Sequence, residues 1–290
     1  MPHIARLQST PIGNTEGFIP SQQRPVRVRT RSMPEDTHFE PHFHSWAQLA
    51  YCTSGIVQVT AAQSGQASGE VTYIVPPSRA VWVAPGARHY ITVLEAAEFR
   101  TLYIDANATP QGWQDCRVLV VSPLLREAIQ ALDQLPHAQL VSAKTTAGAP
   151  LSAAREQLLS ALVLDEISRA DIQSLGVALP HPQTGDKRLR ALCEAVLRAP
   201  SSRATLSEWA AHIGASERTL ARLFRDELNL SYQQWRQQAV LAHALPLLAR
   251  GQPVSQVAAA SGYASDSAFS AMFKAAMGEP PSHFYTKKRL

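Results

Sequence analysis

The chain has 290 residues, of which 45% are hydrophobic and 17% are charged. This length favours two domains, and the composition is that of a globular rather than a disordered protein. The sequence contains no apolar run of about 18 residues, which excludes a transmembrane helix of ordinary length. Its first residues are polar and interrupted by prolines, without the apolar core of a secretory signal. We therefore expect a cytoplasmic protein with no membrane partner.

Charge is unevenly distributed along the chain. Residues 1–185 carry 13 Lys and Arg against 15 Asp and Glu, whereas residues 186–290 carry 14 against 8. A basic module attached to a nearly neutral one indicates a polyanionic partner for the basic module. Cys52, Cys116 and Cys193 are widely spaced and include no Cys-x-x-Cys pair, so buried free thiols are expected rather than disulfides or a thiolate zinc site.

Residues 26–104 have the pattern of short β-strands. The expected strands are rich in Val, Ile, Tyr and Thr, alternate with period two and are separated by turns with glycine or proline: VRVRT, AQLAY, GIVQVTA, GEVTYIVP, AVWVAP, HYITVL and FRTLYI. This spacing favours a small antiparallel barrel or jelly roll. The arginines of RPVRVRTR (residues 24–31) would either line one solvated face of a strand or form an arm that touches DNA or the other domain.

The period becomes helical after the strands. Apolar residues recur at i, i+3 and i+4 in residues 122–135 and 151–169, which predicts two helices that we expect to mediate dimerisation. Residues 174–186 contain prolines and glycines without periodicity, which is typical of an interdomain linker. Further helices are expected at 187–198, 207–213, 216–227, 232–249, 254–261 and 265–277, with a last turn at 281–285. The expected division is a barrel over residues 1–121, helices over 122–173, a linker over 174–186 and an all-α domain over 187–290.

Two helix pairs near the end of the chain repeat each other. The sequences LSEWAAHIGASERTLARLFRDEL and VSQVAAASGYASDSAFSAMFKAAM share Ala-Ala in the first helix, a glycine in the turn and a serine that opens the second helix. Such a repeat is typical of a duplicated helix-turn-helix. The helix expected between the two pairs has 18 residues, so it would be about 27 Å long at about 1.5 Å per residue. The second helices of the pairs would then lie roughly one DNA turn apart, about 34 Å.

These residues carry a family resemblance. The segment 216–284, with RTLARLF, Trp-Arg, SGYASDSAFSAMFK and a closing Gly-x-x-Pro, resembles the C-terminal domain of AraC/XylS-type transcription regulators. The resemblance implies a sequence-specific DNA-binding regulator, an activator or a repressor, with RNA polymerase as a candidate partner. It also implies DNA-binding roles for Ser216, Glu217, Arg218, Thr219, Ala221, Arg222, Arg225, Ser265, Asp266, Ser267, Ser270 and Lys274.

Some positions depart from the family pattern. Ala271 stands where many relatives carry Arg, Asn229 replaces a Gly, and Val240 replaces a common Arg. We therefore expect the first unit to read bases more strongly than the second, with Arg225 and Lys274 on phosphates. The apolar residues of the reading helices are expected in the core: Leu220, Leu223, Phe224, Phe269 and Phe273.

The stretch HFEPHFHSWAQLAY raises a second question. His42 and His44 point to one side of a strand because side chains alternate with period two, and Gln48 keeps the same parity. His89 follows a Pro-Gly turn on a later strand, whereas His38 precedes Pro41 and is expected at the surface. The pattern resembles the two metal motifs of cupin barrels, with Gln48 in place of the usual Glu. The resemblance implies a site for Zn²⁺, Ni²⁺ or Fe²⁺ formed by His42, His44 and His89.

Three uses of this histidine cluster remain open. The cluster could hold a metal ion that is sensed, or support catalysis in a cupin enzyme whose helices only oligomerise. It could also form a metal-free pocket for a small organic effector, lined by His42, His44, Gln48, His89 and the aromatic residues Tyr51, Trp82 and Tyr103. Because AraC-type regulators commonly carry a cupin-like domain that binds an effector, the resemblance favours an effector-controlled, homodimeric regulator that is not an enzyme.

Overall fold

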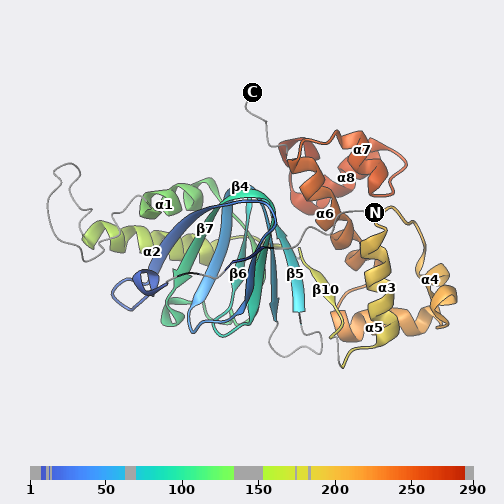
Figure 1. Ribbon diagram of the computed structural model, residues 1–290, viewed down its shortest axis with the longest axis horizontal. Coiled ribbons are helices and arrows are strands. Elements are labelled where there is room, and N and C mark those ends of the chain that lie inside the picture. Colours follow the sequence, from blue (N-terminus) through green and yellow to red (C-terminus); the bar gives the residue numbers. More distant parts are fainter. Residues whose placement is uncertain are drawn as a thin grey trace.

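The computed structural model describes residues 8–10, 13, 15–62, 70–133, 153–173, 175–181 and 184–284. A β-sheet part carries two helices on one side, and a helical part lies against its other side (Figure 1). This arrangement confirms the expected fold class, a cupin-like β domain followed by an all-α domain with two helix-turn-helix units. Within the described ranges, no helix combines the length and the apolar character that crossing a membrane requires.

The described residues contain ten strands in one sheet, antiparallel apart from the pairing of β1 with β3. Their bounds are β1 (Gln8–Thr10), β2 (Val26–Met33), β3 (Thr37–His42), β4 (Ala47–Ala62), β5 (Glu70–Val75), β6 (Arg79–Val83), β7 (His89–Ile104), β8 (Arg117–Val120), β9 (Ile172–Gln173) and β10 (Val177–Leu179). Short 3-10 turns, η1 (Glu16–Phe18) and η2 (Ala106–Ala108), accompany them. The strands β3, β7, β4 and β6 are successive neighbours, so β4 and β7 lie at the centre of the sheet.

β4 and β7 each unite two segments that the sequence suggests as separate strands. The pairing of β4 with β7 shifts register between Cys52 and Val57, and Gly55 lies in this stretch with a φ of +75°. A Cβ at Gly55 would overlap the carbonyl oxygen of Ala96, so only glycine fits here. The glycine therefore marks a β-bulge that bends a continuous strand, not a turn between two strands.

Two helices, α1 (Pro123–Asp133) and α2 (Ala153–Arg169), cover one face of the sheet (Figure 1). The arginine-rich segment helps to hold them. Glu156 of α2 accepts hydrogen bonds from Arg24 at 2.7 Å and from Arg27 at 3.3 Å. Arg29 and Arg31 lie over the rings of Phe18 and Phe39. The arginines of residues 24–31 therefore make contacts within the sheet part and with α2. They neither line a purely solvated face nor form an arm toward DNA.

The helical part contains α3 (Lys187–Arg198), α4 (Leu206–Ile213), α5 (Glu217–Leu228), α6 (Tyr232–Ala249), α7 (Val254–Ala260) and α8 (Asp266–Met277), followed by η3 (Pro281–Phe284). Each expected helix is present with ends within one residue of the prediction. Leu220, Phe224, Phe269 and Phe273 are buried as expected, while Leu223 is half-buried against the same core. α6 is continuous even though Pro246 lies in its last turn.

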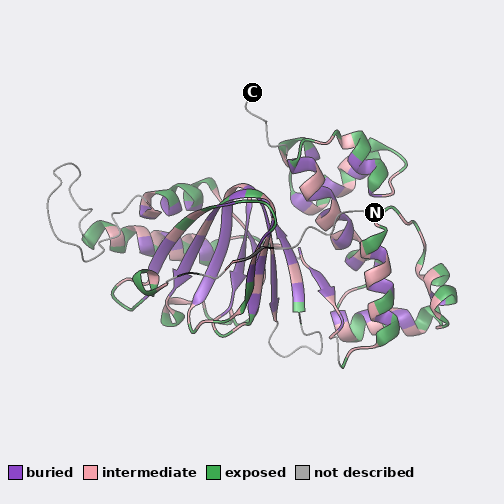
Figure 2. Cartoon of the chain, viewed as in Figure 1, coloured by how far each residue is buried: buried purple, intermediate pink, exposed green. Residues whose placement is uncertain are grey.

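The segment expected to be a linker is partly structured. Residues 177–179 form β10, which pairs with β5, and the indole nitrogen of Trp235 in α6 donates a hydrogen bond to the carbonyl oxygen of Ala178 at 2.7 Å. α6 also packs on β4, β5 and β7. The two parts therefore share a continuous buried core (Figure 2), which local sequence signals in the linker did not indicate.

Polar contacts flank this shared core. Arg79 of β6, 3% exposed, donates hydrogen bonds to the side chain of Gln173 at 2.6 Å and to the carbonyl oxygen of Met277 at the end of α8. Arg250, just after α6, binds Glu35 at 2.6 Å. The three cysteines are buried free thiols, as expected, and burial raises the pKa of Cys52 to about 12 and that of Cys116 to about 11.

Candidate functional site

The first helix-turn-helix unit consists of α4 and α5. Thr205 caps α4 in a capping box with Glu208, and Gly214 ends α4 in the left-handed region with a φ of +71°. The hydroxyl of Ser216 then accepts a hydrogen bond from the main-chain nitrogen of Thr219 at 3.1 Å. Since a serine cap satisfies an otherwise free N–H group, it fixes where α5 begins.

The second unit, α7 and α8, repeats this construction. Ser265 caps α8 by accepting a hydrogen bond from the main-chain nitrogen of Ala268 at 3.2 Å. Gly262 lies in the turn with a φ of +79°, and a Cβ there would lie 2.5 Å from the carbonyl oxygen of Ser201. The turn glycine is therefore required by conformation and by the close approach of the segment before α4.

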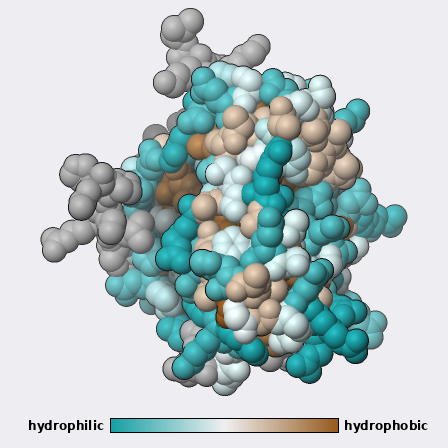
Figure 3. Space-filling model, turned by 90° about the vertical axis from the view of Figure 1, so that its right-hand side faces the viewer, coloured by the Kyte–Doolittle hydropathy of each residue, from teal (hydrophilic) through white to brown (hydrophobic). Residues whose placement is uncertain are grey.

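The expected DNA-binding side chains lie mainly at the surface of α5 and α8. Exposed residues are Ser216, Glu217, Arg218, Arg222, Arg225, Ser265, Asp266, Ser267 and Lys274, and half-buried ones are Thr219, Ala221 and Ser270. Hydrophilic side chains cover much of the molecular face formed by the helical part (Figure 3). The amino-terminal turns of both helices are thus accessible to a partner.

A hollow of about 530 Å³ next to α5 was not predicted. Residues from α4, α5 and the start of α6 line it: Thr205, Leu206, Ser207, Glu217, Ala221, Arg225, Ser231, Tyr232 and Gln233. The signal in the sequence is the pair of capping residues Thr205 and Ser231, because each marks a helix amino terminus at the rim. Helix amino termini carry a partial positive charge and suit anionic groups.

The histidine cluster forms inside the β-sheet part. His42 ends β3, His89 begins β7 directly opposite it in the sheet, and His44 follows in the turn before β4. One ring nitrogen from each of the three histidines lies within 4.8 Å of those of the others. Gln48 of β4 adds its side-chain amide, 2.9 Å from Nε2 of His44 and 3.2 Å from Nε2 of His89. The structure therefore brings together the four side chains that the sequence pattern groups: His42, His44, Gln48 and His89.

Main-chain carbonyl oxygens fix the tautomer of all three rings. The Nδ1 atoms lie close to carbonyl oxygens: His42 with Glu40 (2.8 Å), His44 with Trp46 (2.6 Å) and His89 with Ala87 (2.9 Å). Because a carbonyl oxygen only accepts hydrogen bonds, each Nδ1 carries the proton and donates. In a neutral ring the Nε2 atom then has no proton and acts as an acceptor through its lone pair. The amide oxygen of Gln48 also only accepts. Four acceptor atoms thus converge without a donor among them, an arrangement that a cation or a flipped Gln48 amide satisfies.

Burial keeps these imidazoles neutral. It lowers the pKa of His42 and His44, and burial together with the neighbouring histidines lowers the pKa of His89 to about 3. The cavity beside the cluster measures about 20 Å³, close to the space one water molecule needs. His38 lies apart from the cluster, half-buried, with its Nδ1 3.0 Å from the hydroxyl of Thr92.

Comparison with known proteins decides the family. Residues 24–228 match the AraC-like ligand binding domain, and residues 209–287 match a helix-turn-helix domain. The chain belongs to the AraC family. It is 31% identical over 265 residues to the HTH-type transcriptional regulator NimR of Escherichia coli, covering 86% of this chain and 91% of NimR. The E. coli arabinose operon regulatory protein is 27% identical over 130 residues, 44% of each chain. A solved structure of ToxT from Vibrio cholerae aligns over 90% of this chain and 97% of its own, with 12% identity and a TM-score of 0.35.

AraC-family membership confirms that the chain is a DNA-binding transcription regulator with an N-terminal ligand-binding domain, as the resemblance implied. The cavity beside the histidines departs from the expected list, however. Tyr51 and Trp82 are buried against α1 and α2 on the other side of the sheet. Tyr51 is an odd number of residues from Gln48, so period-two alternation turns it away from the cluster.

Tyr103 does lie at the cluster, with its ring centroid 6.0 Å from that of His44. Sequence reasoning missed Trp46, whose ring stacks on His44 at 5.1 Å between centroids. It also missed other residues of the cavity wall in this AraC-family barrel: Arg31, Phe39, Ile91, Phe99 and Thr101. Phe99 and Thr101 share the parity of Tyr103 on β7, which is the signal that could have identified them, and Arg31 of β2 pairs with Phe99.

Proposed function

We propose that this AraC-family protein binds double-stranded DNA with the amino-terminal turns of α5 and α8, and that it controls transcription in the cytoplasm in contact with RNA polymerase. One observation carries the proposal: Ser216 and Ser265 cap two exposed helix starts in two units joined by the single helix α6. In a helix-turn-helix these turns meet base edges in the major groove.

The two units are proposed to contribute unequally. Arg218 and Arg222 are exposed on α5, and arginine reads guanine through a bidentate pair of hydrogen bonds. α8 offers Asp266 and Ser267, with Ala271 one turn further, and these are weaker or less selective readers. Arg225 beside the hollow between α4 and α6, and Lys274 on α8, are assigned to phosphates.

The test is binding to duplex DNA from the region upstream of the protein's own gene, followed by fluorescence anisotropy. Replacement of Arg222 by Ala should weaken binding by about 1–3 kcal/mol and relax the preference at one base pair. The matched control is Arg169→Ala, an exposed arginine on α2 that should leave the affinity unchanged. Equal losses for both variants, or binding that does not fall with salt, would contradict the assignment.

We further propose that a ligand bound by the barrel controls DNA binding. Support comes from α6, which joins the two DNA-reading units and also packs on β4, β5, β7 and β10. A ligand that binds one arrangement of barrel and helices more tightly would shift the population toward it. A gel-shift series with candidate effectors tests the coupling; one DNA affinity under all conditions would remove it.

A metal ion is the ligand that the histidine cluster favours. One ring nitrogen from each histidine lies within 4.8 Å of the others, and the Gln48 oxygen lies beside those of His44 and His89, a spacing that a single ion can bridge. The adjoining cavity, which His42 and Gln48 line, measures about 20 Å³ and is in this conformation too small for an organic effector. The hydrogen bonds from Nδ1 to main-chain oxygens are the outer contacts that metal-binding histidines usually make. A tetrahedral ion with ligands at about 2.1 Å brings nitrogens to about 3.4 Å, so binding would draw the rings together.

Metal analysis of protein purified without a histidine tag tests this assignment. We expect close to one equivalent of Zn²⁺, Ni²⁺ or Fe²⁺, lost in His89→Ala and weakened in Gln48→Leu. The variant Gln48→Glu supplies a charged ligand in place of a neutral one, so it should bind the metal ion more tightly than the parent protein. Less than a tenth of an equivalent in the parent protein, together with no gain in Gln48→Glu, would leave the metal-free pocket as the better explanation.

Dimerisation through α1 and α2 is also proposed, because Leu124 is 50% exposed and Leu158 is 72% exposed on these helices. Sedimentation of the parent and of Leu158→Glu tests it: the variant should sediment as a monomer. A catalytic role is not proposed, since the curated relatives are regulators.

A further inference from the structure

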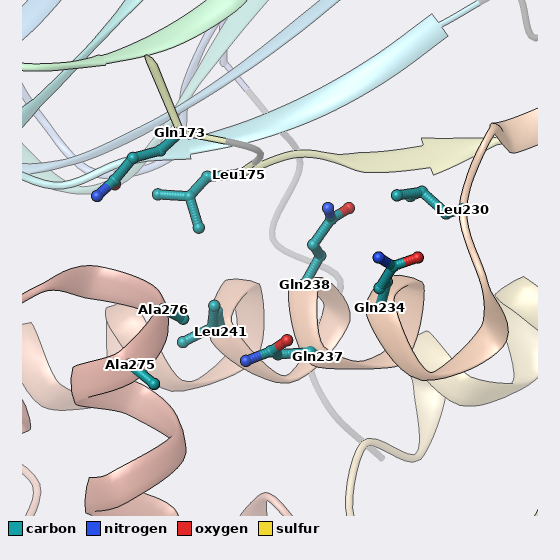
Figure 4. Close-up of a pocket in the computed structure, with 9 residues that line it drawn as sticks. All are labelled: Gln173, Leu175, Leu230, Gln234, Gln237, Gln238, Leu241, Ala275 and Ala276. Atoms are coloured by element: carbon teal, nitrogen blue, oxygen red, sulfur yellow. The ribbon is translucent and has the colours of Figure 1, made fainter. Parts of the chain in front are cut away.

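A hollow of about 350 Å³ lies between the sheet part and the helical part, away from the histidine cluster (Figure 4). We call it the glutamine pocket and define it by its lining: Gln173, Leu175, Leu230, Gln234, Gln237, Gln238, Leu241, Ala275 and Ala276. In Figure 4 Gln234 and Gln238 of α6 point toward the segment that carries Gln173 and Leu175, whereas Gln237 points toward α8 with Ala275 and Ala276. Three units of the fold therefore meet at this pocket.

The lining has a distinctive chemistry. Four of its nine residues are glutamines, the other five are leucine or alanine, and none carries an ionisable side chain. A glutamine amide carries two N–H donors and a carbonyl acceptor. The oxygens of Gln173 and Gln234 already accept hydrogen bonds from Arg79 and Ser231, so these two amides present mainly their N–H groups to a ligand. A charged molecule would exchange part of its hydration here for neutral amides and apolar side chains, without meeting an opposite charge among the lining residues, which is unfavourable. An uncharged molecule with an apolar body and several donors and acceptors would satisfy both kinds of surface.

The size of the pocket also suits a ligand. Small-molecule sites commonly measure about 300–1,000 Å³, whereas the cavity beside the histidines measures about 20 Å³. A second hollow of about 310 Å³ lies along α6 around His243, and a narrow cavity of about 10 Å³ shares lining residues with both. The interface between the two parts is thus incompletely filled on both sides of α6, unlike a close-packed interior.

We propose that the glutamine pocket binds a small uncharged organic molecule, as a second ligand site separate from the barrel. Its position gives such a ligand a route to the DNA-binding surface. Gln173 accepts a hydrogen bond from Arg79 at 2.6 Å, and Arg79 also donates to the carbonyl oxygen of Met277 in α8. A molecule held between Gln173, Gln237 and Ala275 contacts the sheet part, α6 and the second reading helix together. Binding therefore favours the arrangement of these three that the structure has.

Three probes of the same shape test the preference for an uncharged ligand: benzamide, benzoate and benzamidinium. They carry charges of zero, minus one and plus one on one planar ring. Each is titrated into the full-length protein, and the side-chain amide signals of glutamine are followed by NMR. We expect benzamide to shift the signals of Gln234, Gln237 and Gln238 in a saturable manner, and benzoate and benzamidinium to bind at least tenfold more weakly. Equal binding of all three, or no saturable shift with benzamide, would overturn the proposal.

Variants locate the binding. Gln237→Leu removes an amide from the pocket, and Ala275→Phe fills it from α8; each should weaken benzamide binding at least fivefold. Gln233→Leu is the matched control, since Gln233 lies on α6 but outside the pocket lining, and it should bind as the parent does. Circular dichroism verifies that all three fold. Loss of benzamide binding in Gln233→Leu as well, or in neither pocket variant, would overturn the location. DNA affinity measured without any probe separates this outcome from failure of the regulator assignment.

Discussion

Replacement of His89 by Gln should remove one defined part of the acid sensitivity of the sheet part. His89 is 1% exposed, and burial with two neighbouring histidines lowers its pKa to about 3, whereas an unfolded histidine titrates near pH 6.5. As the pH falls, His89 of the unfolded state therefore takes up a proton before His89 of the folded state does. The stability that the neutral ring contributes is complete above about pH 6.5 and is lost as the pH falls from there toward 3. Between pH 8 and pH 5 this one group lowers the free energy of unfolding by about 2 kcal/mol. The unfolded ring is protonated over the roughly 1.5 pH units between its pKa of about 6.5 and pH 5, at about 1.4 kcal/mol per unit, while the folded ring stays neutral.

Urea unfolding at pH 8 and pH 5, with a chelator to keep metal out, measures this difference. The parent protein should lose stability on acidification by about 2 kcal/mol more than His89→Gln does. Burial also lowers the pKa of His42 and His44, so those rings add losses of the same sign in both proteins. Thr101→Val is the matched control, because it alters the wall of the same cavity without removing a titrating group or a hydrogen bond to one, and it should keep the parental pH dependence. Identical pH dependence in the parent and His89→Gln would refute the argument that the ring is buried in neutral form.

Three other substitutions test separate contacts. Trp235→Phe keeps an aromatic ring but leaves the buried carbonyl of Ala178 without its donor, so unfolding free energy should fall by about 1–3 kcal/mol in urea titrations; no change would mean that this bond does not tie the two parts together. Gly262→Ala should cost at least about 1–3 kcal/mol in the same assay, because positive φ and the approach to Ser201 both exclude a side chain. Ala271→Arg should tighten DNA binding by anisotropy, by about 1–3 kcal/mol where a guanine lies opposite, if α8 enters a groove.

The helical part could be predicted almost completely because its signals are local. Thr205, Ser216, Ser231 and Ser265 each accept a hydrogen bond from a main-chain nitrogen three residues later. Such caps depend only on neighbouring residues, so the sequence defines helix starts without knowledge of the tertiary fold. The repeat supports these helix boundaries a second time, because the sequence of α7 and α8 can be aligned with that of α4 and α5.

The sheet part could be predicted less well because strand pairing is not local. β9 and β10 have two and three residues, and they are strands only because β8 and β5 are there to pair with them. The prediction of the residues that line the histidine cavity was incomplete for a different reason. Nearness in sequence suggests Tyr51 as a neighbour of Gln48, but parity places the two side chains on opposite faces of the strand. Arg31 reaches the cavity through the pairing of β2 with β7, where it lies opposite Phe99, and no spacing within one strand reveals this.

The same helix that spaces the two reading units also carries the contact with the sheet. α6 runs without interruption from Tyr232 to Ala249, and Trp235 in its second turn is bonded to β10. A shift of the sheet at β10 would therefore move α6 as a body and carry α5 and α8 with it, leaving their mutual spacing nearly constant. Arg79, in contrast, donates its hydrogen bond to the helical part at the end of α8, to the carbonyl oxygen of Met277. It follows that a ligand acting through β10 changes where a whole DNA-binding domain lies relative to its own barrel and, in the proposed dimer, relative to the second copy. A ligand acting through Arg79 can instead alter the position of the second reading helix alone.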